Sequence, residues 1–325
     1  MKNIAVVCGG DSGEFEISIQ SGRVVAQNLN PEKYKTYLIV IKGKEWYYES
    51  TPTKRHLIDK NDFSLLIDEQ KIHFDAVFNA IHGVPGEDGR LTGYLDLLGI
   101  PYTSCNHDTA ALTFNKEFCK NVVSSYGVQI PKSVLLRKDI QYDTAEIVEA
   151  IGLPAFVKPN SNGSSVGITK VKSTEELNPA IDKAFDFDHE ILIETFIQGV
   201  EIGCSVMQTQ KGLIVFPLTE IVSKKEFFDY EAKYTAGMAD EITPARINSK
   251  AETAISHLAS YLYKKLNCSG FVRFDFILQK DAIVFLEVNT VPGISPASIL
   301  PQQAEVMGIS LSELFGMAID NIIVS

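Results

Sequence analysis

The sequence predicts an α/β protein that opens with a parallel sheet and continues into two further units. Asn3–Cys8 has the pattern of a buried strand, a glycine-rich turn follows at residues 9–13, and helical periodicity then continues to Leu29. Strand and helix patterns go on alternating through the N-terminal part, which favours an open parallel sheet. A length of 325 residues also exceeds what a single hydrophobic core usually holds.

Further strand patterns complete the first unit and define the other two. Tyr37–Ile41 and Ala76–Ile81 extend the first sheet, and Ala76–Ile81 leads into a second glycine-rich loop at residues 82–89. Open sheets bind ligands beyond the carboxyl ends of their strands, where both loops fall. A boundary near residues 104–113 gives units of residues 1–112, 113–201 and 202–325. After a helix at residues 115–126, the predicted strands are Ala155–Lys158, Val166–Val171, Glu190–Glu194, Cys204–Gln208, Phe271–Leu278 and Ile283–Asn289.

Composition and charge exclude several classes of protein. With 30 Lys and Arg against 41 Asp and Glu, the net charge of -11 argues against a nucleic-acid or anionic-membrane partner, although a local basic pocket could still bind a nucleotide. The five cysteines are scattered, odd in number and without a CxxC pair, so neither a disulfide framework nor a zinc site is indicated. No apolar run approaches the ~20 residues that span a bilayer. We therefore expect a cytoplasmic protein.

Two strand patterns carry polar residues where burial predicts apolar ones. Arg273 and Asp275 share one face of the first strand, and Glu287 and Asn289 share one face of the second. If the strands pair as a hairpin around residues 279–281, three oxygen-bearing side chains converge with one arginine between them. Carboxylate and amide oxygens are ligands that magnesium prefers, together with phosphate oxygens. The alternative is a solvated sheet face with an incidental ion pair.

A loop of small residues follows Lys158 at the end of a predicted strand. Such a loop lets backbone N–H groups approach a phosphate while the lysine supplies charge. The loop lacks the GxxxxGK[ST] order of a P-loop and is not followed by a convincing helix, so it resembles a flap between strands. Taken alone, an ordinary surface hairpin is equally compatible with the pattern.

The stretch from Leu192 to Glu201 is predicted to be an apolar edge strand followed by a turn. Its carboxylates, Glu194 and Glu201, are spaced so that both could hydrogen-bond a bound adenosine. The alternative is a linker between domains with surface acids.

The order of these elements resembles that of the ATP-grasp ligases, and further motifs resemble the D-alanine–D-alanine ligase family from about residue 4 to residue 315. The ATP-grasp residues are Lys116, Lys158 with its loop, Glu194, Glu201, Arg273-x-Asp275 and Glu287-x-Asn289. The more specific motifs are residues 9–18 (GGDSGEFEIS), 81–89 (IHGVPGEDG), 229–234 (DYEAKY) and 287–293 (EVNTVPG).

The resemblance implies a fold of an N-terminal parallel-sheet domain followed by two α+β ATP-grasp subdomains that clasp the nucleotide. It implies an enzyme that uses ATP to phosphorylate one D-alanine, joins it to a second, and so supplies the peptidoglycan precursor D-alanyl-D-alanine. It further implies a homodimer and two Mg²⁺ ions, which Mn²⁺ could replace. By motif, Lys116, Lys158 and Ser165 correspond to phosphate-binding residues, Glu194 and Glu201 to adenine and ribose ligands, and Asp275, Glu287 and Asn289 to metal ligands.

The same resemblance implies roles for the substrate residues. Arg273 and the Gly293 N–H would form an oxyanion hole. Glu14 would bind the ammonium of the first D-alanine, with His82 near its carboxylate. Ser164 and Tyr234 would bond with Glu14 to close the flap and a second loop over the site, excluding water. Lys233, Ser298 and Ile299 would line the pocket of the second D-alanine. Without the motifs, Glu14 is equally a first-turn helix acid, His82 a satisfied buried histidine and Tyr234 an exposed loop aromatic.

Three positions depart from the family pattern. Thr195 follows Glu194 where many relatives carry lysine, which puts one contact to adenine in doubt, and Pro296 and Ile299 stand where the family often has His and Leu. Ser298 is retained, so we expect the second pocket to persist with altered packing. Two alternatives stay open at this stage: a non-catalytic nucleotide-binding relative, and a ligase that takes D-lactate or D-serine as acceptor.

Overall fold

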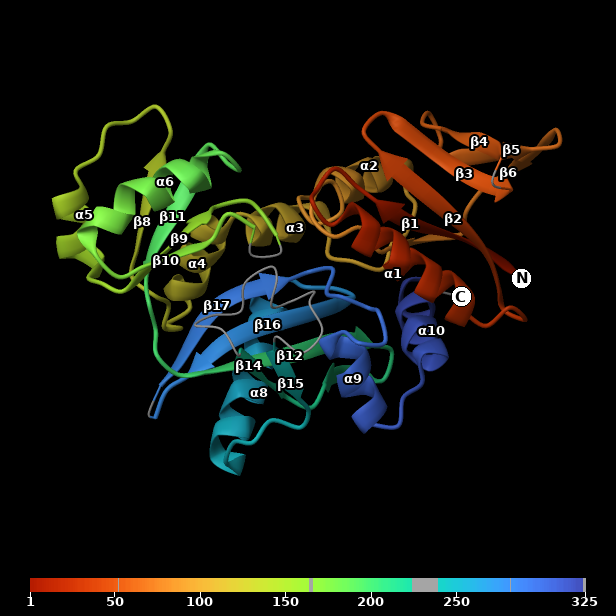
Figure 1. Ribbon diagram of the computed structural model, residues 1–325. Coiled ribbons are helices and arrows are strands. Elements are labelled where there is room, and N and C mark those ends of the chain that lie inside the picture. The colour runs from red at the N-terminus through yellow and green to blue at the C-terminus, as the bar shows by residue number, and fades with distance from the viewer. Residues whose placement is uncertain (52, 164–165, 224–238, 281, 324–325) are drawn as a thin grey trace.

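The computed structural model describes residues 1–51, 53–163, 166–223, 239–280 and 282–323. Three sheets follow one another along the chain, and each is the centre of one unit (Figure 1). The N-terminal and central sheets lie on opposite sides of the molecule in this view, with the third sheet below them. The predicted α/β fold with three successive units is confirmed, while the boundaries at residues 112/113 and 201/202 stay a prediction.

The N-terminal sheet has seven strands in the order β6-β5-β4-β3-β2-β1-β7. The predicted parallel part consists of β1 with its neighbours β2 and β7. Four strands that the sequence analysis did not identify pair antiparallel beyond β2 and make the sheet mixed. The elements are β1 (Lys2–Gly9), α1 (Phe15–Asn28), β2 (Tyr34–Lys42), β3 (Glu45–Thr51), β4 (Lys54–Asp59), β5 (Ser64–Ile67), β6 (Gln70–Ile72), β7 (Ala76–Asn79) and α2 (Arg90–Leu98).

The central sheet has four antiparallel strands in the order β10-β9-β11-β8. The prediction that the strand ending at Glu194 lies at an edge is wrong, because β8, which was not predicted, covers its outer side. Helices α5 and α6 pack on one face of the sheet. The elements are β8 (Ser133–Arg137), α5 (Thr144–Ile151), β9 (Ala155–Pro159), β10 (Thr169–Val171), η1 (Thr174–Glu176), α6 (Leu177–Phe185) and β11 (Glu190–Thr195).

The third sheet runs β15-β14-β12-β16-β17, with β13 paired to β12. One face packs against α8, and residues of α4 join the same core. Helix α4 also contacts the central sheet through Lys120 and Glu194, so α4 lies between the two sheets. The elements are α3 (His107–Phe114), α4 (Lys116–Ser125), β12 (Val200–Thr209), β13 (Gly212–Val215), β14 (Thr219–Ser223), β15 (Ala239–Ile242), α8 (Ser249–Lys265), β16 (Phe271–Leu278), β17 (Ile283–Asn289), α9 (Ile299–Val306) and α10 (Leu311–Ile322).

The C-terminal helix α10 returns to the N-terminal unit and packs against α1 and β7. Phe315 of α10 meets Phe78 of β7 edge to face, with 5.6 Å between the ring centroids. This shared apolar core fixes the loops at the ends of β1 and β7 against the third sheet. Among the described residues, no helix combines the length and apolar character needed to span a membrane.

Candidate active site

The β16–β17 hairpin brings the polar residues of the two strands together. The strands pair antiparallel, with Arg273 opposite Asn289 and Asp275 opposite Glu287. The guanidinium of Arg273 donates to both oxygens of Asp275, from Nε at 2.8 Å and from Nη2 at 2.9 Å. Asn289 Nδ2 donates to Asp275 Oδ2 at 3.0 Å. The predicted convergence of three oxygen-bearing side chains around one arginine is therefore confirmed as geometry.

Alternation along β16 explains why these polar residues point toward the site. Val272, Phe274 and Phe276 are fully buried on the opposite face, in the core that includes α8. Burial alone would lower the pKa of Arg273. The adjacent Asp275 carboxylate and other nearby carboxylates outweigh this effect, so the net pKa is raised and the guanidinium stays charged. The fork fixes the plane of the guanidinium, which leaves its remaining N–H groups aimed at a defined position.

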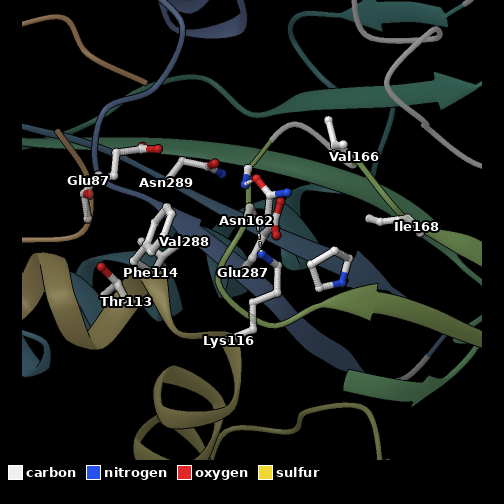
Figure 2. Close-up of a pocket in the computed structure, with 13 residues that line it drawn as sticks. Glu87, Thr113, Phe114, Lys116, Asn162, Val166, Ile168, Glu287, Val288 and Asn289 are labelled. Carbon is white, nitrogen blue, oxygen red and sulfur yellow. Dashed lines mark hydrogen bonds between the residues drawn. The ribbon is translucent and has the colours of Figure 1, made fainter. Parts of the chain in front are cut away.

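A small cavity of about 50 Å³, called the inner cavity here, lies between α4, the loop after β9 and strand β17. Lys116 at the start of α4 reaches up to that loop, where its Nζ donates to the carbonyl of Asn162 at 2.6 Å (Figure 2). Glu287 and Asn289 line the cavity from β17, and Glu87 closes it from the N-terminal unit. As predicted, the loop joins two antiparallel strands rather than a strand and a helix.

A larger cavity of about 430 Å³, called the apolar cavity, lies between the central sheet and the third sheet. Glu194 and Lys158 line it from the central sheet, Glu201 lines it from β12, and Glu287 lines it at the end shared with the inner cavity. Its apolar walls come from Phe156, Ile168, Phe196, Ile197, Ile277 and Leu286. A flat aromatic ring system with polar edges suits a slot of this kind.

Glu194 forms ion pairs with two lysines, only one of which the sequence analysis identified. Lys158 contacts one carboxylate oxygen, and Lys120 contacts the other. Lys120 is 1% exposed, and burial together with the Lys158 ammonium lowers its pKa. The sequence signal for Lys120 was its position one helical turn after Lys116 on the same face of α4.

A third cavity of about 300 Å³, called the cross-unit cavity, lies between the N-terminal unit and the third sheet. The structure brings six of the predicted substrate and catalytic residues together here. Gly163 also reaches it, and a side-chain Cβ at Gly163 would lie 2.7 Å from Glu14 Oε2, so the loop after β9 approaches Glu14 closely. The six predicted residues in the lining are Glu14, His82, Arg273, Gly293, Ser298 and Ile299.

Two residues of the 82–89 loop hold the backbone of Val291, close to Gly293. His82 Nδ1 lies 2.9 Å from the Val291 carbonyl oxygen, and its Nε2 lies 2.9 Å from Ser21 Oγ. Glu87 accepts from the Val291 N–H at 3.0 Å and from the Gly83 N–H at 2.8 Å. Glu87 belongs to the motif at residues 81–89, although no role was predicted for it. These contacts couple the N-terminal unit to the loop that carries the predicted oxyanion donor.

The pH dependence of stability should report the buried Glu87. Burial, and then the Glu14 carboxylate, raise the pKa of Glu87 from 4.5 to about 7, against the two backbone donors that lower it. The folded state therefore holds this proton between pH 4.5 and 7 while the unfolded chain releases it. Stability that is present below pH 4.5 is lost as the pH rises to about 7. We expect the wild type, relative to Glu87→Gln, to lose roughly 3 kcal/mol across this range.

Urea unfolding of both proteins from pH 4.5 to 8 measures this difference. Glu32→Gln is a matched control, because Glu32 is an exposed carboxylate of the same unit. If the wild type instead gained stability relative to Glu87→Gln as the pH rises, the raised pKa assigned to Glu87 would be contradicted.

The departures from the family pattern have distinct structural outcomes. The Thr195 hydroxyl turns away from Glu194 and donates to the Ile151 carbonyl at 2.6 Å. Pro296 is exposed and lies outside the cavity lining, whereas Ile299 is buried and lines it. Four predicted site residues lie outside the described part of the chain: Ser164, Ser165, Lys233 and Tyr234.

The hairpin unites the three cavities. Glu287 lines both the apolar and the inner cavity, and Asn289 lines both the inner and the cross-unit cavity. Together with the two antiparallel sheets on either side of the apolar cavity, this arrangement defines an ATP-dependent ligase of the ATP-grasp class. Two family models match the chain, "D-ala D-ala ligase N-terminus" over residues 3–105 and "D-ala D-ala ligase C-terminus" over residues 122–322. The chain belongs to the D-alanine–D-alanine ligase family.

Relatives of similar length support this membership. The chain is 47% identical to a D-alanine–D-alanine ligase of Flavobacterium johnsoniae, covering 98% of this chain and 99% of the relative. It is 42% identical to the enzyme of the same name from Bacteroides fragilis, with the same coverage.

Solved structures agree. The VanG D-Ala:D-Ser ligase of Enterococcus faecalis matches with a TM-score of 0.88 at 36% identity, covering 99% of both chains. The D-alanine–D-alanine ligase of Bacillus anthracis complexed with ATP matches with a TM-score of 0.80 at 29% identity, covering 99% of this chain and 97% of the other.

Proposed function

We propose that this protein condenses two D-alanine molecules to D-alanyl-D-alanine at the expense of ATP, releasing ADP and phosphate, and so supplies a peptidoglycan precursor. The observation that carries the proposal is the meeting of three cavities at one hairpin. The apolar cavity suits adenosine, the inner cavity suits phosphates, and the cross-unit cavity suits two small amino acids. Phosphoryl transfer from nucleotide to amino acid requires these three volumes to be continuous.

ATP would bind with its base against Glu194, its ribose near Glu201 and its phosphates at Lys116 and Lys158. Backbone groups of the loop after Lys158, including Ser165, would add contacts to phosphate oxygens. Each of these side chains within the described residues lines one of the two nucleotide cavities.

Two Mg²⁺ or Mn²⁺ ions would be held by Asp275, Glu287 and Asn289. The donor set fits a hard cation, and Asn289 presents its amide oxygen because its Nδ2 donates to Asp275. Among the described residues, no group of three or more His, Cys, Asp or Glu side chains could hold a metal by itself. Phosphate oxygens and water would complete the coordination. When bound, the ions would neutralise charge on the phosphates.

The remaining residues would activate and align the substrates. A carboxylate is a poor electrophile, so one of its oxygens must become part of a leaving group, here by transfer of a phosphoryl group to the first D-alanine. Glu14 would bind the ammonium of that D-alanine, with His82 near its carboxylate. Arg273 and the Gly293 N–H would stabilise the oxyanion that forms when the second amine attacks.

The second D-alanine would bind with its carboxylate near Ser298 and Ile299, which lie at the start of α9 in the cross-unit cavity. Lys233 would add a charge to this contact. Ser164 and Tyr234 would close the flap over Glu14 and keep water from the acyl phosphate. Assembly as a homodimer stays a prediction.

The proposal is tested by phosphate release from ATP against a panel of D-alanine, D-serine and D-lactate, with and without magnesium. We expect release that requires magnesium and D-alanine, with D-alanyl-D-alanine as the main product at neutral pH. Because the VanG relative is a D-Ala:D-Ser ligase, D-serine is the competing acceptor that the panel must include. If the main product contained D-serine or D-lactate, that compound and not D-alanine would be the acceptor. Nucleotide binding without turnover would indicate a non-catalytic relative.

A further inference from the structure

Lys120 is a buried lysine that the proposed reaction does not use. It projects from α4, one turn after Lys116, and is 1% exposed. Its ammonium contacts one oxygen of Glu194, while Lys158 contacts the other oxygen of the same carboxylate. Glu194 is 3% exposed and forms part of the wall of the apolar cavity. Two lysines therefore share one buried carboxylate at the edge of the proposed nucleotide site.

The two lysines differ in what they can reach. Lys158 lines the apolar cavity from β9, at the start of the loop that continues to the inner cavity, whereas Lys120 lies behind Glu194 and is absent from the cavity lining. A phosphate that enters can therefore attract Lys158 away from Glu194, but it cannot reach Lys120. If Lys158 moved and no second cation remained, Glu194 would be left as a buried, unpaired carboxylate, which is a costly state.

We propose that Lys120 is the positioning residue that keeps Glu194 charged and in place when Lys158 moves to the nucleotide phosphates. The inference rests on the proposed function, in which the adenine base lies against Glu194, and it adds that the adenine 6-amino group donates to this carboxylate. With Lys120 present, Glu194 can serve the base while Lys158 serves the phosphates. Without Lys120, Glu194 would lose its ion pair whenever Lys158 turned to the phosphates.

The experiment compares the binding of ADP with that of purine riboside 5′-diphosphate, which lacks the 6-amino group, by calorimetry with magnesium present. A hydrogen bond to a charged acceptor predicts that the wild type prefers ADP by about 10-fold or more. In Lys120→Met, ADP should bind on the order of 10²-fold more weakly, and the preference should fall to roughly 3-fold or less. Lys138→Met, which removes an exposed lysine of the central unit, should match the wild type.

A double variant separates this role from a purely structural ion pair. Adding Glu194→Gln to Lys120→Met removes the carboxylate that pairs with Lys158, so this ion pair no longer competes with the phosphates for the lysine. The double variant should therefore bind purine riboside diphosphate about as tightly as the wild type and more tightly than Lys120→Met. If the ion pair were purely structural, the double variant would instead bind both nucleotides more weakly than Lys120→Met does, or the binding of both nucleotides would weaken by the same factor. Because the double variant leaves no unpaired buried carboxylate, it also serves if Lys120→Met does not fold.

Each outcome is decisive. A Lys120→Met protein that keeps the wild-type preference for ADP would overturn the inference, as would a double variant that binds no more tightly than the single one. A wild type that does not distinguish the two nucleotides would overturn the placement of adenine at Glu194, and the inference with it.

Discussion

Glu287→Gln is expected to reduce turnover by at least about 10³-fold while leaving the fold intact, because it removes an anionic metal ligand without changing shape. Glu287 lies opposite Asp275 in the hairpin and lines the two cavities assigned to the nucleotide. No neighbouring position on β17 can supply a replacement, since Leu286 lines the apolar cavity and Val288 is apolar and largely buried.

Asp275→Asn should cause a similar loss, but it is the less selective test. Asp275 also holds both N–H groups of the Arg273 fork, so its amide would disturb the arginine as well as the metal. Phosphate release at saturating magnesium measures both variants, with Glu305→Gln on the exposed side of α9 as the control. Near-normal release by Glu287→Gln would defeat the metal assignment.

Arg273→Lys is expected to lower kcat by about 10²–10³-fold with smaller changes in either KM, by analogy with the removal of one oxyanion donor. The planar fork binds Asp275 through Nε and Nη2 at 2.8 and 2.9 Å, which fixes the other N–H groups at the cross-unit cavity. A lysine would keep the charge but could neither hold both oxygens of Asp275 nor present a donor at the same position.

Steady-state kinetics with ATP and D-alanine varied in turn separate kcat from the two KM values. Arg137→Lys is the matched control, because Arg137 donates to Glu190 at 2.8 Å in an exposed pair far from the hairpin. An unchanged kcat with a raised KM for ATP would place Arg273 in ground-state nucleotide binding.

The hairpin could be predicted from sequence because its signal is local. Within the apolar strands Phe271–Leu278 and Ile283–Asn289, polar residues stand at alternate positions, 273 and 275 in the first and 287 and 289 in the second, and the structure has strands with the same bounds. Strands β3, β4 and β6 were missed because they are largely exposed and so lack a continuous apolar face, and β5 because it has only four residues. Strand β8 was also missed, which led to the wrong edge position for the strand that carries Glu194.

The roles of Lys120 and Glu87 were not predicted because the environment of each side chain is created by distant segments. A lysine on an amphipathic helix ordinarily faces solvent, and only the packing of α4 between two sheets buries Lys120 beside Glu194. Glu87 acquires its second donor from Val291, in a segment more than half the chain away. The order of the motifs indicated which residues carry the chemistry. Tertiary packing determines which other residues hold those side chains and loops in place.

The central claim is that a carboxylate oxygen of the first D-alanine passes to phosphate before the peptide bond forms, and an isotope experiment tests it most directly. D-alanine labelled with ¹⁸O in its carboxylate is incubated with the enzyme, ATP and magnesium, and both products are measured by mass spectrometry. The account predicts D-alanyl-D-alanine together with one ¹⁸O atom in each molecule of released phosphate. Unlabelled phosphate accompanying the dipeptide, or labelled phosphate with no dipeptide, would contradict it.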